Sequence, residues 1–182
     1  MARNTVSRSL HDVGLSAWFG GTLANAVALN AAAGQAGDQA SRGRTVNAGW
    51  DRWTPVNAAA IGAHIVGSIG QLGGNKTRVA NQQGVVGMAV LKTAVTAAAL
   101  GVTAYSRVLG KKVSQYDAVP LESGTSPSAA TPPEVAKAQK QLSALQWAVP
   151  ALTGGLVVIT SYAGEQQRAS EVHKGFLDRF LA

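Results

Sequence analysis

The sequence has no cysteine among its 182 residues, and it has few acidic residues. Without cysteine the chain can form no disulfide bond, thiolate metal site or covalent haem attachment. Nine Asp and Glu stand against 16 Lys and Arg, which gives a formal net charge of +7. Because these cations are scattered over every connection without interleaved aromatic residues, they indicate membrane-flanking charge that favours anionic headgroups. We therefore expect no nucleic acid partner.

Charged residues are absent altogether from residues 15–37 and 142–164. The alternative to a membrane protein is an Ala-rich soluble four-helix bundle, but a soluble helix normally carries a charged outer face. Helices without that face would expose apolar surface to water on all sides. The mean hydropathy is nevertheless only slightly positive, because most of the apolar residues are small. The missing charge favours a membrane environment.

Four apolar stretches are each long enough to cross a bilayer, which takes about 20 residues of helix. They cover residues 10–33, 53–72, 84–105 and 142–163. The second is the weakest, because it carries Asn57, His64 and Gln71. We predict an all-α fold: a four-transmembrane-helix bundle made of two helical hairpins, within a single integral membrane domain over residues 1–182.

The connections and the membrane orientation are less strongly determined. Residues 113–133 contain several prolines among Ser, Thr and Ala, which predicts a flexible loop. Residues 165–182 separate apolar from charged side chains and predict an amphipathic helix at the headgroup level, with packing on a soluble partner as the alternative. The side of the termini holds seven Lys and Arg and the other side eight, so charge does not decide the orientation. We expect the termini in the cytoplasm and the protein in the cell (inner or plasma) membrane, because the Pro/Ser/Thr loop resembles an exported linker.

Polar residues within the predicted spans form a candidate intramembrane cluster: Asn25, His64, Lys92, Thr96 and Thr153. An ionisable residue in a membrane is costly, so we expect Lys92 to face the bundle. Asp12, at the start of the first span, is the acid that its side chain could approach, and snorkelling towards the interface is the alternative. His64 could carry a proton or ligate a metal or haem, or it could form a hydrogen-bonding contact between helices.

Helical periodicity divides the third span into two faces. Met88, Thr96, Ala99 and Thr103 share the side of Lys92, whereas Val86, Val90, Ala94, Ala97 and Gly101 lie opposite. We expect the second face to meet lipid or a partner subunit. Small residues at four-residue spacing line every span and allow helices to approach closely. The helix-packing positions that we expect are Gly21, Ala63, Gly67, Gly101 and Gly155.

The first span also carries a family resemblance. Leu10-His11, followed after six residues by Trp18-Phe19-Gly20-Gly21, resembles the opening of small bacterial multi-span membrane proteins. That loose group includes copper-resistance D-type proteins and several uncharacterised integral membrane families. The resemblance covers residues 10–21 and implies a metal or haem contact at His11. The chain differs from a copper-handling pattern in having two methionines and no cysteine. Its Ala-, Gly- and Arg-rich composition resembles that of actinobacterial proteins.

No catalytic motif or phosphate-binding loop is present in the sequence, so we expect neither an enzyme nor a bound cofactor or metal. The rows of small residues favour a structural role, as a homo-oligomer or as an accessory subunit bound to other membrane helices in the lipid bilayer. A first alternative is a carrier of protons, ions or small solutes with a polar midplane at His64, Lys92 and Asn25. A second alternative is a haem- or metal-binding redox component that uses His11.

Overall fold

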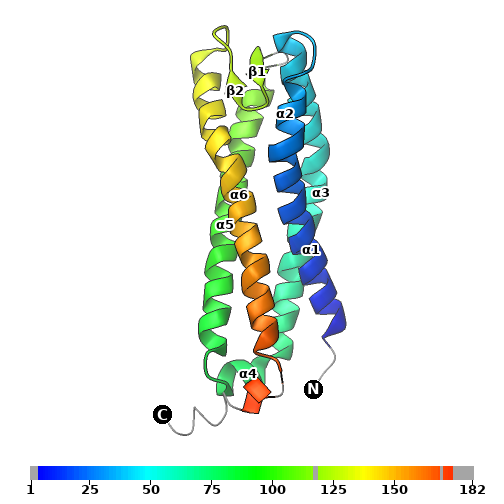
Figure 1. Cartoon of the computed structure of the whole chain (residues 1–182), viewed down its shortest axis with the longest axis vertical. Helices are drawn as coiled ribbons and strands as arrows, with labels where there is room; N and C mark the ends of the chain where they lie inside the picture. Colours follow the sequence, from blue (N-terminus) through cyan, green and yellow to red (C-terminus); the bar gives the residue numbers. More distant parts are fainter. Residues whose placement is uncertain (1–3, 117–118, 169, 174–182) are drawn as a thin grey trace.

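The computed structural model describes residues 4–116, 119–168 and 170–173. Long helices form an elongated bundle (Figure 1), which confirms the all-α prediction. The first rod consists of α1 (Thr5–Ala24), the π-helical turn η1 (Asn25–Leu29) and α2 (Asn30–Ala33). The other three are α3 (Gln39–Gly74), α5 (Val85–Ser114) and α6 (Pro133–Glu165). The short α4 (Lys76–Asn81) joins α3 to α5 at the end of the bundle where α1 begins.

The bundle consists of two hairpins that meet along one side. α3 packs mainly on α1, and α5 packs mainly on α6. The hairpins join chiefly through α1 and α6, whereas α3 and α5 approach each other only weakly. Close to the end of the bundle opposite α4, Asn30 donates to Gln146 Oε1 over 2.7 Å and accepts from Trp50 Nε1 over 3.3 Å. These hydrogen bonds connect the two hairpins.

Two of the helices, α5 and α6, are long and apolar enough to cross a membrane. Of their most apolar 18-residue windows, only 11 % and 22 % are buried. The core helix of a soluble protein would bury most of such a window. α1 and α3 do not pass the same test, because α1 carries Arg8, His11 and Asp12 and because polar residues interrupt α3. The four-span prediction therefore goes further than helix composition supports.

The rotation of α5 agrees with the periodicity of its sequence. Ala99 is fully buried, and Lys92 is partly buried on the same side. Val90 is 63 % exposed on the opposite face, together with Val86 and Gly101. The prediction of which face of this helix points into the bundle is confirmed.

The segment after α5 differs from the predicted flexible loop over residues 113–133. β1 (Leu121–Ser123) pairs antiparallel with β2 (Ser126–Pro127), with Leu121 opposite Pro127. The hairpin covers the end of the bundle opposite α4 (Figure 1). Val119 and Leu121 are 1 % exposed and pack with Leu109, Val113, Val135 and Ala138. Val119 and Leu121 are isolated apolar residues in a mostly polar segment, and their burial holds this segment against the bundle.

The helices are also longer than the apolar stretches. α3 begins at residue 39 instead of 53, α5 ends at 114 instead of 105, and α6 begins at 133 instead of 142. Pro133, in the first turn of α6, has a ring geometry that suits a helix start. The polar residues that follow it extend the helix, and a search for apolar stretches does not detect them. The predicted amphipathic helix over 165–182 lies largely outside the described residues.

Candidate functional site

Four ionisable side chains meet near the α4 end of the bundle: His11 and Asp12 of α1, His64 of α3 and Lys92 of α5. The Asp12 side chain is 55 % exposed and contacts His11 from the surface. Both histidines are fully buried, and their ring centroids lie 4.5 Å apart. Trp18, two helical turns further along α1 than His11, is also fully buried, with its ring centroid 6.1 Å from that of His64. We call His11, Asp12, His64 and Lys92 the His–Lys cluster.

A repeated sequence pattern brings the two histidines together. His11 is followed three residues later by Gly14, and His64 by Gly67, in the matching segments His-Asp-Val-Gly and His-Ile-Val-Gly. A Cβ on Gly67 would lie 2.3 Å from the backbone nitrogen of His11, and a Cβ on Gly14 would lie 2.5 Å from that of His64. Each glycine therefore makes room for the backbone of the opposite histidine. The repeat is a signal that the periodicity argument passed over.

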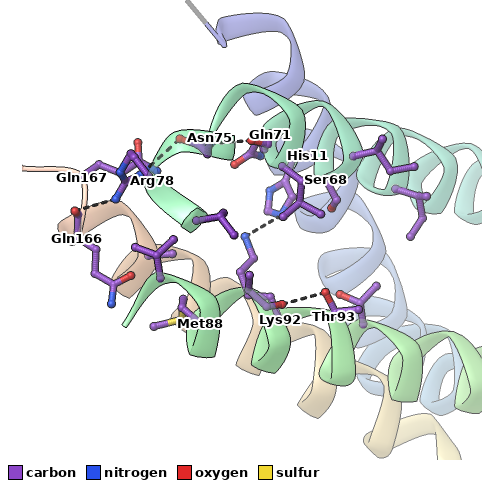
Figure 2. A pocket seen from close by; sticks show the side chains of 18 of the residues that line it. His11, Ser68, Gln71, Asn75, Arg78, Met88, Lys92, Thr93, Gln166 and Gln167 are labelled. Atoms are coloured by element: carbon purple, nitrogen blue, oxygen red, sulfur yellow. Dashed lines mark hydrogen bonds between the residues drawn. The ribbon is translucent and has the colours of Figure 1, made fainter. Parts of the chain in front are cut away.

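Hydrogen bonds link Lys92, His11 and Asp12 into a chain. Lys92 Nζ lies 3.3 Å from His11 Nε2 (Figure 2). His11 Nδ1 lies 2.7 Å from Asp12 Oδ1. A lysine ammonium can only donate, so His11 Nε2 accepts and His11 Nδ1 donates its proton to the Asp12 carboxylate. His64 Nδ1 is 3.4 Å from the carbonyl oxygen of His11, and its Nε2 has no hydrogen-bond partner in the described part of the chain. Lys92 thus reaches Asp12, the acid that the sequence offered as its possible partner, through His11.

Three adjoining cavities surround the cluster at the α4 end of the bundle. The first, about 330 Å³, lies between α3 and α5 and is lined by His11, Lys92 and Thr96. The second, about 580 Å³, reaches Asp12 and Lys92 from the side of α6. The third, about 850 Å³, is lined by Arg8, Asp12 and Arg78. Gln71 and Gln167 line all three, so we treat them together as one vestibule.

Beyond the cluster the interior is tightly packed. Trp18, Ala99 and Leu156 are fully buried, and Trp18 lines none of the three cavities. Trp18 packs with Ala60, Ala99 and Val149 into an apolar core. The vestibule therefore gives access to the His–Lys cluster from the α4 end.

The predicted midplane cluster is only partly assembled. His64, Lys92 and Thr96 lie at the site, together with His11 and Asp12. Asn25 begins η1, 14 residues beyond His11, which is about 21 Å along a helix axis. Thr153 is fully buried but donates to the carbonyl of Val149 in its own helix, 2.8 Å away.

The predicted helix-packing positions differ between the two hairpins. Gly67 and Gly21 lie at the interface of α1 and α3, where Gly21 faces the ring of Trp53, and Ala63 is partly buried. Gly101 of α5 and Gly155 of α6 have open space where a Cβ would stand. Of the five predicted packing positions, the three that lie on the first hairpin are at a helix interface or partly buried, and the two on the second hairpin are open.

The polar residues that the sequence argument missed are Arg8, Gln71, Arg78 and Gln167. They come from both ends of the chain and from α3 and α4, so no local pattern relates them. Comparison with known protein families, with curated proteins and with solved structures finds no match for this chain.

Proposed function

We propose that this chain is an integral membrane protein of the cell membrane, with all four long helices crossing the bilayer and the termini on the cytoplasmic side. α1 and α3 expose large apolar residues as α5 and α6 do: Val13 is 68 % exposed, Val66 60 % and Ile69 65 %. Exposed apolar surface on every helix is unfavourable in water and favourable in lipid. The polar residues of α1 and α3 that lower their hydropathy include His11 and His64, which are fully buried.

The bundle is longer than the hydrocarbon core is thick, which indicates that part of it lies outside the bilayer. α3 has 36 residues and measures about 54 Å, against a hydrocarbon core of about 30 Å. Many charged residues lie in the half of the bundle that carries the β-hairpin: Arg42, Arg44, Asp51, Arg52, Arg107, Lys111, Lys112, Glu134, Lys137 and Lys140. We place that half in water, with Val119 and Leu121 in its own small core.

Within this bundle we propose that the His–Lys cluster carries protons. The observation that carries the proposal is the hydrogen-bonded chain Lys92–His11–Asp12 at the inner end of the vestibule. Intramembrane ionisable residues mark ion and proton pathways, and histidine is the side chain best suited to exchange a proton near neutral pH. Trp18 and the apolar core around it lie beyond the cluster, so we infer a carrier that must change conformation and not an open pore.

Proton flux into proteoliposomes tests this function directly. The purified full-length chain is reconstituted, an inside-negative potassium diffusion potential is imposed, and the internal pH is followed with a trapped dye. We expect flux above that of empty liposomes, and its loss in Lys92→Met and His64→Ala. Lys112→Met is the matched control, because Lys112 also lies on α5 but pairs with exposed Glu134 over 3.4 Å at the opposite end. Equal flux in protein-free and protein-containing liposomes would overturn the proposal.

A structural role as a homo-oligomer or accessory subunit is the second candidate. Its support is the outward face of α5, where Gly87 and Gly101 have open space beside them and Ala94 and Ala97 are exposed. Small residues on an outer face let a partner helix approach. Gly101→Leu should then lower the oligomeric mass measured in mild detergent, or release a co-purifying partner. An unchanged monomer in both forms would remove this candidate.

The haem or metal alternative has less support. The imidazoles of His11 and His64 pack directly against each other, and Lys92 occupies the Nε2 side of His11. The described residues hold no group of three or more His, Cys, Asp or Glu placed to bind a metal ion. A visible absorption spectrum and a metal analysis of the purified protein test this alternative, which requires a Soret band or a stoichiometric metal.

A further inference from the structure

The vestibule carries positive charge that the described residues neutralise only in part. Arg8, Arg78 and Lys92 line it, and no described carboxylate lies within salt-bridge distance of any of the three. Asp12 also lines it and accepts from His11 over 2.7 Å, and its single negative charge leaves the three cations in excess. Glu165 pairs instead with Arg168 over 2.8 Å. This end of the bundle is therefore electrostatically complementary to an anion.

Arg78 is the best-positioned of these cations. Its Nη2 donates to the carbonyl oxygen of Gln166 over 2.8 Å (Figure 2). Its Nε donates to Gln82 Oε1 over 2.9 Å. These neutral acceptors orient the guanidinium between α4 and the end of α6 without compensating its charge. Partial burial, and then repulsion by Arg8, lower the pKa of Arg78. An anion placed here would relieve that repulsion.

The cavity beside Arg78 continues as an apolar groove between α3 and α5. Its walls are Ile65, Ile69 and Leu72 of α3 with Met88 and Leu100 of α5. The groove exists because these two helices pack only weakly on each other. Met88 and Leu100 are 12 residues apart, which is about 18 Å along the helix. That length is close to one leaflet of a hydrocarbon core about 30 Å thick.

We propose that this groove binds one anionic phospholipid of the leaflet on the α4 side, with its phosphate at Arg78 and an acyl chain between α3 and α5. A cationic entrance joined to an apolar groove of leaflet length matches both parts of such a lipid, whereas a free anion would leave the apolar walls uncovered. The proposal rests on the membrane location of the bundle. His11 and Lys92 line the same cavity, so the bound lipid would lie beside the His–Lys cluster.

Native mass spectrometry of the full-length chain in mild detergent measures the bound lipid. The probes are phosphatidylglycerol, phosphatidylcholine and glycerol phosphate, the last of which supplies the headgroup without acyl chains. We expect one phosphatidylglycerol retained per chain, at least about tenfold more tightly than either other probe. Phosphatidylcholine carries a quaternary ammonium that the cations of the vestibule repel, and glycerol phosphate has no acyl chain to cover the apolar walls. Equal retention of the two lipids, or equally tight binding of glycerol phosphate, would overturn the proposal.

Two matched pairs of variants locate the site. Arg78→Gln should weaken phosphatidylglycerol binding about tenfold, whereas Lys76→Gln, which changes an exposed cation on the same helix outside the cavities, should leave it within about threefold. Ile69→Ser should weaken it severalfold, whereas Val66→Ser, an equally exposed position of α3 outside the groove, should not. Equal effects within both pairs would refute this placement. Failure of proton flux in liposomes with lipid binding intact would affect only the carrier function.

Discussion

Replacing Gly67 with alanine gives the sharpest test of how α1 and α3 cross. The new methyl carbon would lie 2.3 Å from the backbone nitrogen of His11 and 2.6 Å from the carbonyl oxygen of Ser7. Ordinary van der Waals contact begins near 3.4 Å, so α1 must move by about 1 Å. Both neighbours are backbone atoms of a helix and cannot swing aside as a side chain could.

The expected cost follows from this overlap. Adding one methyl group to a tightly packed site typically costs about 1 to 3 kcal/mol. Gly62→Ala is the matched control, because Gly62 lies on the same helix with nothing within 4 Å of the new methyl carbon. There alanine should stabilise the helix by about 0.5 to 1 kcal/mol. The two variants should therefore differ by roughly 2 to 4 kcal/mol in the free energy of unfolding.

Thermal unfolding in mild detergent, followed by helical circular dichroism, provides the assay. Each kcal/mol shifts the midpoint by about 2 to 4 °C for a chain of this size. Gly14→Ala should behave like Gly67→Ala, because its methyl carbon would lie 2.5 Å from the backbone nitrogen of His64. If Gly67→Ala unfolds at the same temperature as Gly62→Ala, the reciprocal crossing that stacks the two histidines is wrong.

Three further predictions concern the junction of the hairpins, the start of α3 and the cluster. Asn30→Ala should cost about 2 kcal/mol in thermal unfolding, because it leaves Gln146 and Trp50 without their partner; no loss would refute that junction. The backbone nitrogen of Ser41 donates to Asp38 and lowers the pKa of this carboxyl, so the stabilisation is present above the ordinary value of 3.8 and is lost as pH falls through the lower folded value. Unfolding measured against pH should therefore show a smaller loss in acid for Asp38→Asn than for the wild type, and parallel curves would contradict the cap. Asp12→Asn should reduce proton flux and change its pH profile, whereas Asp51→Asn, at the exposed pair with Arg107, should change neither.

Several parts of the fold could be predicted because they depend on local periodicity. The apolar stretches lie within the long helices, and the 3.6-residue repeat of α5 placed Lys92 and Ala99 inward and Val90 outward. The cost of an unpaired cation in an apolar helix gave the physical reason for that rotation. The β-hairpin was missed because Val119 and Leu121 are isolated apolar residues in a polar segment, and only the groove between α5 and α6 makes their burial possible.

The candidate site shows the same division. Its ionisable members could be named from the sequence, because His11, Asp12, His64 and Lys92 are rare residues in apolar surroundings. Their arrangement could not, since it depends on the axial offset of α1 against α3, which the clearance at Gly14 and Gly67 determines. The groove between α3 and α5 depends in turn on how the two hairpins meet. Composition and periodicity therefore determined the helices and their inward faces, whereas the tertiary structure alone decided which residues meet, because contacts between distant segments depend on helix offsets that no local pattern encodes.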